Sequence, residues 1–143
     1  LEVARKMGAD AVFNSGRCNL PAEMKALTGG IGVDVAIDIT GAAPAINTGL
    51  KCVRAAGRMV CVGLPSKPVT LEDMTDDLIY REVQLTGVSG RKIWETWEDF
   101  AKVVQGPWYK MDQVIGGRFA LEDYEKALEQ IRAGVPGKMI LYP

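Results

Sequence analysis

Residues 33–41 read Val-Asp-Val-Ala-Ile-Asp-Ile-Thr-Gly, an apolar run that contains two aspartates and is closed by glycine. A short run rich in β-branched residues and bounded by glycine is typical of a strand, so we predict a strand over 33–39. A helix-like segment over 43–56 and an apolar strand over 59–62 follow it. This alternation predicts an α/β fold, a doubly wound parallel sheet with crossover helices.

The flanking segments continue the pattern. Toward the N-terminus we predict the end of a helix over 1–8, a strand over 11–14 and a helix over 21–28. Toward the C-terminus we predict strands over 82–88, 114–119 and 139–141, and helices over 94–105 and 121–133. In the helix over 43–56, Ile46, Leu50 and Val53 recur on one face and are expected in the core, as is Trp97 in the helix over 94–105. Because the chain opens inside a helix, we expect it to be a piece of a longer one.

Composition excludes several classes of function. The chain has 143 residues, and its 17 Lys and Arg nearly balance 18 Asp and Glu, for a net charge of −1. We therefore expect no nucleic-acid partner and no polybasic membrane anchor. The chain has no histidine. That excludes a Ser-His-Asp triad, a Cys-His dyad and every zinc site that needs an imidazole ligand.

The three cysteines point to a reducing compartment. Cys18, Cys52 and Cys61 are odd in number and widely spaced, without a C-x-x-C motif, so Cys52 and Cys61 are interpreted as small buried apolar residues. No secretory signal pattern or membrane-spanning apolar run is present. The expected localisation is cytoplasmic.

Candidate chemistry lies at the ends of three predicted strands. Glycines follow or close them at Gly41, Gly63 and Gly90, and ligands of doubly wound sheets bind outside the carboxyl ends of strands. One such glycine indicates only a tight turn, whereas three together favour a nucleotide crevice. The G-x-G-x-x-G fingerprint is missing, since its nearest counterpart, residues 30–35, ends in valine and precedes a strand.

The acidic residues are interpreted as structural. Asp34 and Asp38 share one face of a strand, but no third ligand supports a metal or acid–base pair, so we expect hydrogen-bonded or solvated positions. The cluster of Glu72, Asp73, Asp76 and Asp77 is interpreted as a solvated loop. We predict no metal site and no catalytic residue in this chain.

Several stretches resemble the zinc-type, medium-chain alcohol dehydrogenase superfamily. They are residues 1–10, 29–35, 56–58 and 62–65. Residues 85–97 and 119–141 are most similar to its threonine-dehydrogenase branch. The resemblance covers nearly the whole chain but only the later part of a family chain. It implies a partial Rossmann-type sheet whose first two strands are missing.

The resemblance implies a set of cofactor-binding residues for NAD or NADP. They are Thr40, Gly41, Val62, Gly63, Leu64, Val88, Arg91 and Lys138. The first two correspond to the adenosine end of the cofactor, and the segment 62–64 to its nicotinamide end. Val88 corresponds to a residue that lines the nicotinamide through its backbone in the family. Arg91 and Lys138 are basic positions near the cofactor, the latter facing the pyrophosphate.

The implied organisation is an incomplete dinucleotide-binding domain over 1–106 and a tail over 107–143 that would pack on a catalytic domain outside this chain. In the intact enzyme, hydride would pass from a secondary alcohol, a small molecule, to NAD while zinc polarises the alcohol oxygen. The alternatives are a non-catalytic α/β interaction module or inactive truncated paralogue, and another nucleotide-binding parallel-sheet fold such as a methyltransferase. For the chain alone we expect negligible activity and weak or no dinucleotide binding.

The absence of the first two strands of this fold also predicts that the chain associates with itself or rearranges. In the strand order 3-2-1-4-5-6, loss of the first two strands separates residues 11–14 from the strand over 33–39 and exposes an apolar edge. We expect the chain either to form a homo-oligomer or to move residues 11–14 beside that strand.

Overall fold

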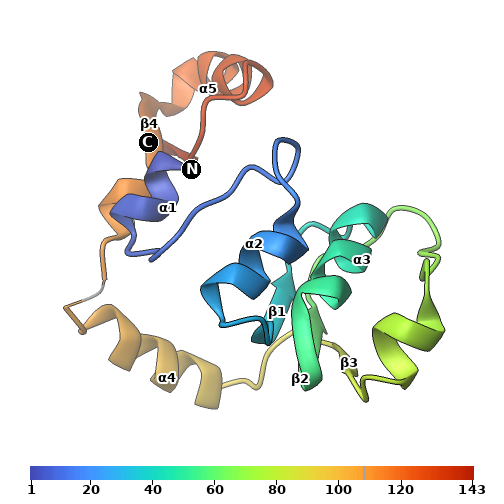
Figure 1. Ribbon diagram of the computed structural model, residues 1–143. Coiled ribbons are helices and arrows are strands. Elements are labelled where there is room, and N and C mark those ends of the chain that lie inside the picture. The colour runs from blue at the N-terminus through green and yellow to red at the C-terminus, as the bar shows by residue number, and fades with distance from the viewer. Residues whose placement is uncertain (108) are drawn as a thin grey trace. The chain divides into compact units, whose positions relative to one another are not determined.

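The computed structural model describes residues 1–107 and 109–143, which form two compact units (Figure 1). One unit is Phe13–Arg91, and the other combines Leu1–Val12 with Lys92–Pro143. The predicted boundary between a cofactor domain over 1–106 and a tail over 107–143 stays a prediction. Within the described ranges, no helix is both long enough and apolar enough to span a bilayer.

A three-stranded parallel sheet forms the centre of the unit Phe13–Arg91. Its order is β1 (Val33–Asp38), β2 (Val53–Cys61) and β3 (Gln84–Gly87). The connections run through α3 (Ala43–Cys52) and through a loop with the π-helix η1 (Thr75–Ile79). Parallel neighbours joined through a helix confirm the predicted α/β class.

The core of this unit lies between α3 and the sheet. Ile46 and Leu50 recur one turn apart on α3, and they pack with Val53 and Met59 of β2 and with Val83. Leu50, Val53 and Met59 are each only 1% exposed. The spacing of Ile46, Leu50 and Val53 therefore identified the buried face, although Val53 belongs to a strand.

A second helix, α2 (Leu20–Leu27), packs beside α3 (Figure 1). The Asn19 side chain accepts a hydrogen bond from the Ala22 amide at 3.2 Å, and Pro21 occupies the first turn. Both features favour a helix start, because the first amides of a helix lack intrahelical partners. The predicted helix over 21–28 is thus confirmed to within one residue at each end.

The predicted helix over 43–56 ends early, at Cys52. Val53 pairs with Val33 and begins β2, and the chain then bulges before Arg58 pairs with Val35. Gly57 does not stop a helix. A Cβ on Gly57 would lie 2.4 Å from Cγ1 of Val53 and 2.9 Å from the Asp34 carbonyl oxygen, so this glycine allows close packing inside the strand.

The predicted strand over 11–14 is wrong. Residues 11–14 adopt no regular structure, and the part of the chain described shows no backbone hydrogen bond from residues 11–13. The expectation that this segment moves beside β1 is also not met, since β1 is an edge strand of the described sheet. Strand formation requires a hydrogen-bonded neighbour, and none is available to these residues here.

The other unit contains a small parallel pair, β4 (Ile115–Ala120) and β5 (Lys138–Tyr142). The helix α5 (Tyr124–Arg132) packs on β4 and buries Ala127, after the 3₁₀ turn η3 (Leu121–Asp123). Another 3₁₀ turn, η2 (Met111–Val114), contacts the short helix α1 (Glu2–Lys6). The predicted segments over 114–119, 121–133 and 139–141 are therefore confirmed, with a 3₁₀ start to the helix.

The helix α4 (Glu95–Val104) is amphipathic, as predicted. Its apolar face includes Trp97 and Phe100, which are 54% and 49% exposed. The prediction of Trp97 as a core residue is wrong. The 3.6-residue period identifies an apolar face but not whether another element covers it.

Candidate dinucleotide-binding edge of the sheet

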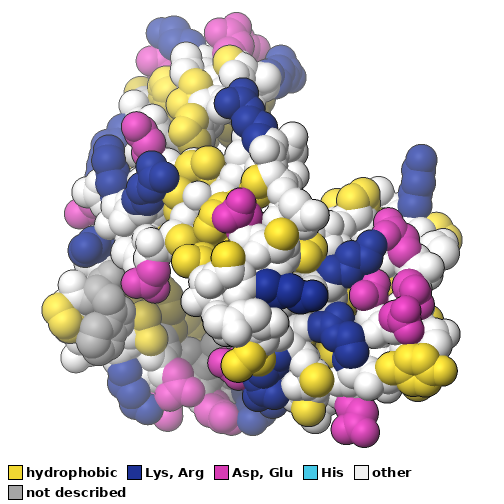
Figure 2. All heavy atoms as spheres, viewed as in Figure 1, with side chains coloured by type: hydrophobic (Ala, Val, Ile, Leu, Met, Phe, Trp, Pro, Cys, Tyr) yellow, Lys and Arg dark blue, Asp and Glu magenta, His cyan; other side chains and the backbone are white. Residues whose placement is uncertain are grey.

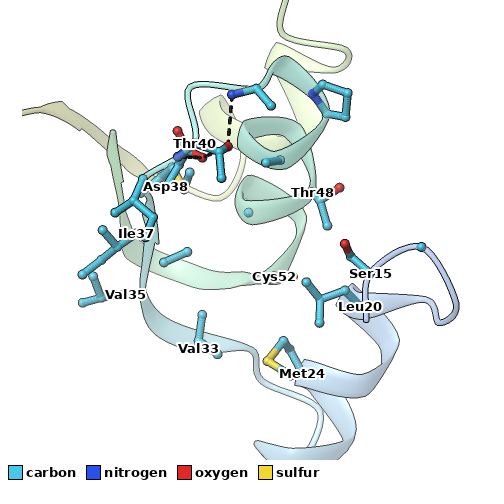
Figure 3. A pocket seen from close by; sticks show the side chains of 18 residues that line it. Ser15, Leu20, Met24, Val33, Val35, Ile37, Asp38, Thr40, Thr48 and Cys52 are labelled. Carbon is cyan, nitrogen blue, oxygen red and sulfur yellow. Dashed lines mark hydrogen bonds between the residues drawn. The ribbon is translucent and has the colours of Figure 1, made fainter. Parts of the chain in front are cut away.

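The turn after β1 is organised by the carboxylate of Asp38. This side chain accepts hydrogen bonds from the Thr40 amide at 3.0 Å, the Thr40 hydroxyl at 2.6 Å and the Gly41 amide at 2.9 Å. The Thr40 oxygen in turn accepts a bond from the Ala42 amide at 3.1 Å, next to the start of α3 (Figure 3). These bonds give Thr40 and Gly41 a defined conformation at the carboxyl end of the strand.

Asp38 is only 5% exposed. Burial acts to raise the pKa of its carboxyl group, but the hydrogen bonds from the Thr40 hydroxyl and the Gly41 and Thr40 amides outweigh it and lower the pKa. Asp38 is therefore an ionised, hydrogen-bonded group inside the turn. The structure thus confirms the prediction that Asp38 is hydrogen-bonded.

Asp34 lies near the opposite end of β1. It is exposed, and its carboxylate pairs with the Arg54 guanidinium at 2.6 Å. The acidic residues over 72–77 make local contacts, among them an ion pair between Glu72 and Lys51 at 2.6 Å. Among the described residues, no group of three His, Cys, Asp or Glu side chains could hold a metal ion.

The turn after β2 is joined directly to the turn after β1. The amides of Val62 and Gly63 donate to the Asp38 carbonyl oxygen at 2.8 and 3.1 Å. A Cβ on Gly63 would lie 2.1 Å from the Gly41 nitrogen, and a Cβ on Gly41 would lie 2.6 Å from the Leu64 carbonyl carbon. Both positions therefore require glycine, and Gly41 also has a φ of +70°.

The end of β3 continues the same edge. The Val88 amide donates to the Cys61 carbonyl oxygen at 2.9 Å, which extends the β2–β3 ladder by one residue. Val62, Leu64 and Val88 are 41%, 86% and 47% exposed. The structure thus brings three strand ends together with accessible apolar side chains and closely packed backbone.

Two predicted site residues do not belong to these three strand ends. Arg91 is exposed and follows β3 by four residues. Lys138 is the first residue of β5, in the other unit, so nothing places it against the strand ends of Phe13–Arg91. The structure therefore brings together Thr40, Gly41, Val62, Gly63, Leu64 and Val88.

Sequence reasoning missed Asn47. This buried residue of α3 donates to the Thr70 carbonyl oxygen at 2.9 Å and accepts from the Glu72 amide at 2.9 Å. It thereby holds the loop after β2 against α3. The sequence did contain a signal for this role. Asn47 lies next to Ile46 and on the same helical face as Leu50, so it could be expected to be buried, and a buried amide requires hydrogen-bond partners.

The surface charges are mixed in sign, as the near-equal numbers of basic and acidic residues lead one to expect. On the face shown in Figure 2, basic and acidic side chains are interspersed rather than gathered into a field of one sign. The expectation of no nucleic-acid partner stays a prediction.

Comparison with known proteins identifies the family. Residues 1–106 match the family described as zinc-binding dehydrogenase. The L-threonine 3-dehydrogenase of Bacillus velezensis is 34% identical over 143 residues, 100% of this chain and 41% of that protein. The enzyme of the same name from Pyrococcus horikoshii is 35% identical over 140 residues, 97% of this chain and 40% of that protein.

A solved alcohol dehydrogenase from Thermotoga maritima superposes with a TM-score of 0.86, at 22% identity, over 99% of this chain and 40% of that chain. This likeness shows the fold, a Rossmann-type parallel sheet. The chain spans about two fifths of the length of the curated relatives it matches. On these findings, the chain belongs to the zinc-binding dehydrogenase family.

Proposed function

We propose that this chain forms the cofactor-domain part of an NAD-dependent alcohol or threonine-type dehydrogenase. The observation that carries the proposal is the contact between the turns after β1 and β2, where Gly63 packs on the backbone of Gly41. In open parallel sheets, ligands bind outside the carboxyl ends of the strands. Glycines at positions 41 and 63 let the two turns pack backbone to backbone, so that the strand ends form one continuous surface against which an extended ligand could lie.

The residues at this edge fit part of a dinucleotide. Thr40 and Gly41 would contact the adenosine end, and Val62, Gly63 and Leu64 would lie beside the nicotinamide. Val88 would contact the nicotinamide through its backbone. When bound, a nicotinamide dinucleotide accepts hydride from the carbon of a secondary alcohol. The role of this chain is to bind and orient the cofactor and to keep its reactive ring against an apolar surface.

Two basic residues belong to the proposed cofactor site. Arg91 and Lys138 would supply positive charge toward the phosphates of NAD or NADP. The chain has no histidine, and the described residues hold no metal-binding group, so they do not fit a zinc ion. No step of the proposed function therefore runs through a metal on this chain, and none of its residues is assigned a catalytic role.

The test is a titration of the isotopically labelled chain with millimolar NAD, followed by amide resonances. We expect weak binding, because the glycine fingerprint for the pyrophosphate is missing. The shifts should concentrate at residues 40–41, 62–64 and 88. Gly63→Ala should abolish them, whereas Gly87→Ala should retain them, since a Cβ on Gly87 meets nothing within 4 Å. Shifts confined to other residues would favour the alternative of a non-catalytic interaction module.

A further inference from the structure

The backbone amides of the turn over 40–42 are all used inside the turn. The Thr40 and Gly41 amides donate to the Asp38 carboxylate at 3.0 and 2.9 Å, and the Ala42 amide donates to the Thr40 hydroxyl oxygen at 3.1 Å. Amides at the start of a helix commonly hold a phosphate group. Here the buried carboxylate of Asp38 takes the place of such an anion. The turn therefore offers none of these three amides to a ligand.

The proton of the Thr40 hydroxyl has a fixed direction (Figure 3). The hydroxyl oxygen lies 2.6 Å from the ionised Asp38 carboxylate. An ionised carboxylate can only accept, so the hydroxyl donates its single proton to Asp38. One of the two lone pairs on the hydroxyl oxygen accepts from the Ala42 amide. What this exposed residue offers to a ligand is the second lone pair, which is a hydrogen-bond acceptor.

The negative charge of Asp38 also reaches the next strand. Burial raises the pKa of the Cys61 thiol, and the Asp38 charge adds to this rise. Cys61 pairs with Asp38 and directly precedes Val62. A phosphate brought to Thr40 would therefore meet both a negative charge and an acceptor lone pair. The hydrogen bonds that create this polarity lie within residues 38–42, so it is set locally.

We propose that Asp38 is a positioning residue, which acts through the Thr40 hydroxyl to select an unphosphorylated ribose hydroxyl at this turn and to reject a phosphate. The inference rests on the proposed function, in which Thr40 and Gly41 contact the adenosine end of the cofactor. Gly41 packs on Gly63, whose segment would lie beside the nicotinamide. The part of the adenosine at Thr40 is therefore the part nearest the middle of the dinucleotide, which is its ribose.

The test uses adenosine 2′-monophosphate and adenosine 3′-monophosphate, which carry the same charge and differ only in which ribose oxygen bears the phosphate. Each is titrated at millimolar concentrations into the isotopically labelled chain, and the shifts of the Thr40 and Gly41 amides give the two dissociation constants. The isomer with its phosphate on the hydroxyl that faces Thr40 should bind about tenfold more weakly than the other. The ratio of the two constants is the readout, because a merely structural defect weakens both isomers alike.

Three variants change this ratio in defined ways. Thr40→Val removes the hydroxyl at nearly constant volume and should bring the ratio close to one, whereas Thr40→Ser keeps the hydroxyl and should preserve it. Asp38→Asn should also lower the ratio, because a side-chain amide can donate to the Thr40 oxygen and release the hydroxyl proton toward the ligand. Thr86→Val is the matched control, since Thr86 is an exposed threonine of β3 outside the turn. It should leave the ratio unchanged.

Equal dissociation constants for the two isomers in the wild-type chain would overturn the inference. A ratio that Thr40→Val leaves unchanged would do so as well, and this variant decides the matter even where Asp38→Asn does not fold. The absence of shifts at residues 40 and 41 with both isomers would likewise overturn it. Shifts at residues 62–64 and 88 on addition of NAD report on the proposed function separately, so that function can stand while this inference fails.

Discussion

Gly63 and Gly41 lie so close that a Cβ on Gly63 would be 2.1 Å from the Gly41 amide nitrogen. The first residue follows β2 and the second follows β1, so their contact joins two neighbouring strand ends backbone to backbone. No flexible side chain separates them that could yield to an added atom. This edge is therefore a rigid feature of the sheet.

Gly63→Ala should destabilise the chain by about 3 kcal/mol, because an added methyl group must displace backbone rather than a side chain. The measurement is the free energy of unfolding in urea. Gly87→Ala is the matched control, with open space around the added Cβ and the same change in backbone entropy. Equal stabilities of the two variants would contradict the close packing of the turns.

Asp38→Asn should lower the free energy of unfolding by about 2 kcal/mol at neutral pH. The amide cannot accept at both of its polar atoms, so one of the donors from Thr40 and Gly41 loses its partner. Asp34→Asn is the control. It removes only an exposed ion pair with Arg54 and should cost below about 1 kcal/mol.

The stability difference between wild type and Asp38→Asn should depend on pH. The pKa of Asp38 is lowered in the folded chain, so its carboxylate stabilises the fold above its ordinary pKa of 3.8, and this contribution is lost as pH falls through the lowered value. The difference in unfolding free energy between wild type and Asp38→Asn should be constant at neutral pH and shrink in acid below 3.8. A difference that grows in acid would show that the pKa is raised instead.

The fold was predictable where the pattern of side chains reports burial. The run over 33–39 and the spacing of Ile46 and Leu50 identified β1 and the buried face of α3. The predicted end of the helix after Val53 was wrong, because one residue can continue a helical period and also begin a strand. The predicted strand over residues 11–14 was wrong for a different reason. Their side chains favour a strand, but pairing depends on a neighbour that the segment itself does not encode.

The site was predictable in part. Thr40, Gly41, Val62, Gly63, Leu64 and Val88 follow strands, and strand ends of a parallel sheet meet at one edge. The reason for glycine at positions 41 and 63 is a contact between two turns that lie far apart in sequence, which no local pattern reports. The bonds of Asn47 to the loop after β2 are likewise long-range.

Asn47→Ala should destabilise the chain by about 3 kcal/mol, because it leaves the Thr70 carbonyl and the Glu72 amide without their partner in a partly buried position. Hydrogen exchange of the Glu72 amide should accelerate along with the fall in unfolding free energy. Lys51→Ala is the control, since its ion pair with Glu72 is exposed and should matter much less. Unchanged exchange at Glu72 would show that Asn47 does not hold the loop.

Thiol labelling at mildly alkaline pH should separate the three cysteines. Burial raises the pKa of the Cys52 thiol, against the smaller opposing effect of the Arg81 and Lys25 charges, and the residue is 4% exposed. The raised pKa and the low exposure both slow alkylation, so Cys52 should be alkylated only as fast as the chain opens or unfolds.

The other two cysteines should react sooner. Cys18 is half-buried in a surface turn and should react first. Cys61 should react more slowly than Cys18, since burial and the Asp38 charge raise its pKa. Mass spectrometry of the alkylated peptides measures the order, and urea supplies the control by exposing all three equally. Because Cys52 is buried, labelling of Cys52 at the rate of Cys18 would mean that the described packing of α3 against β1 opens freely in solution.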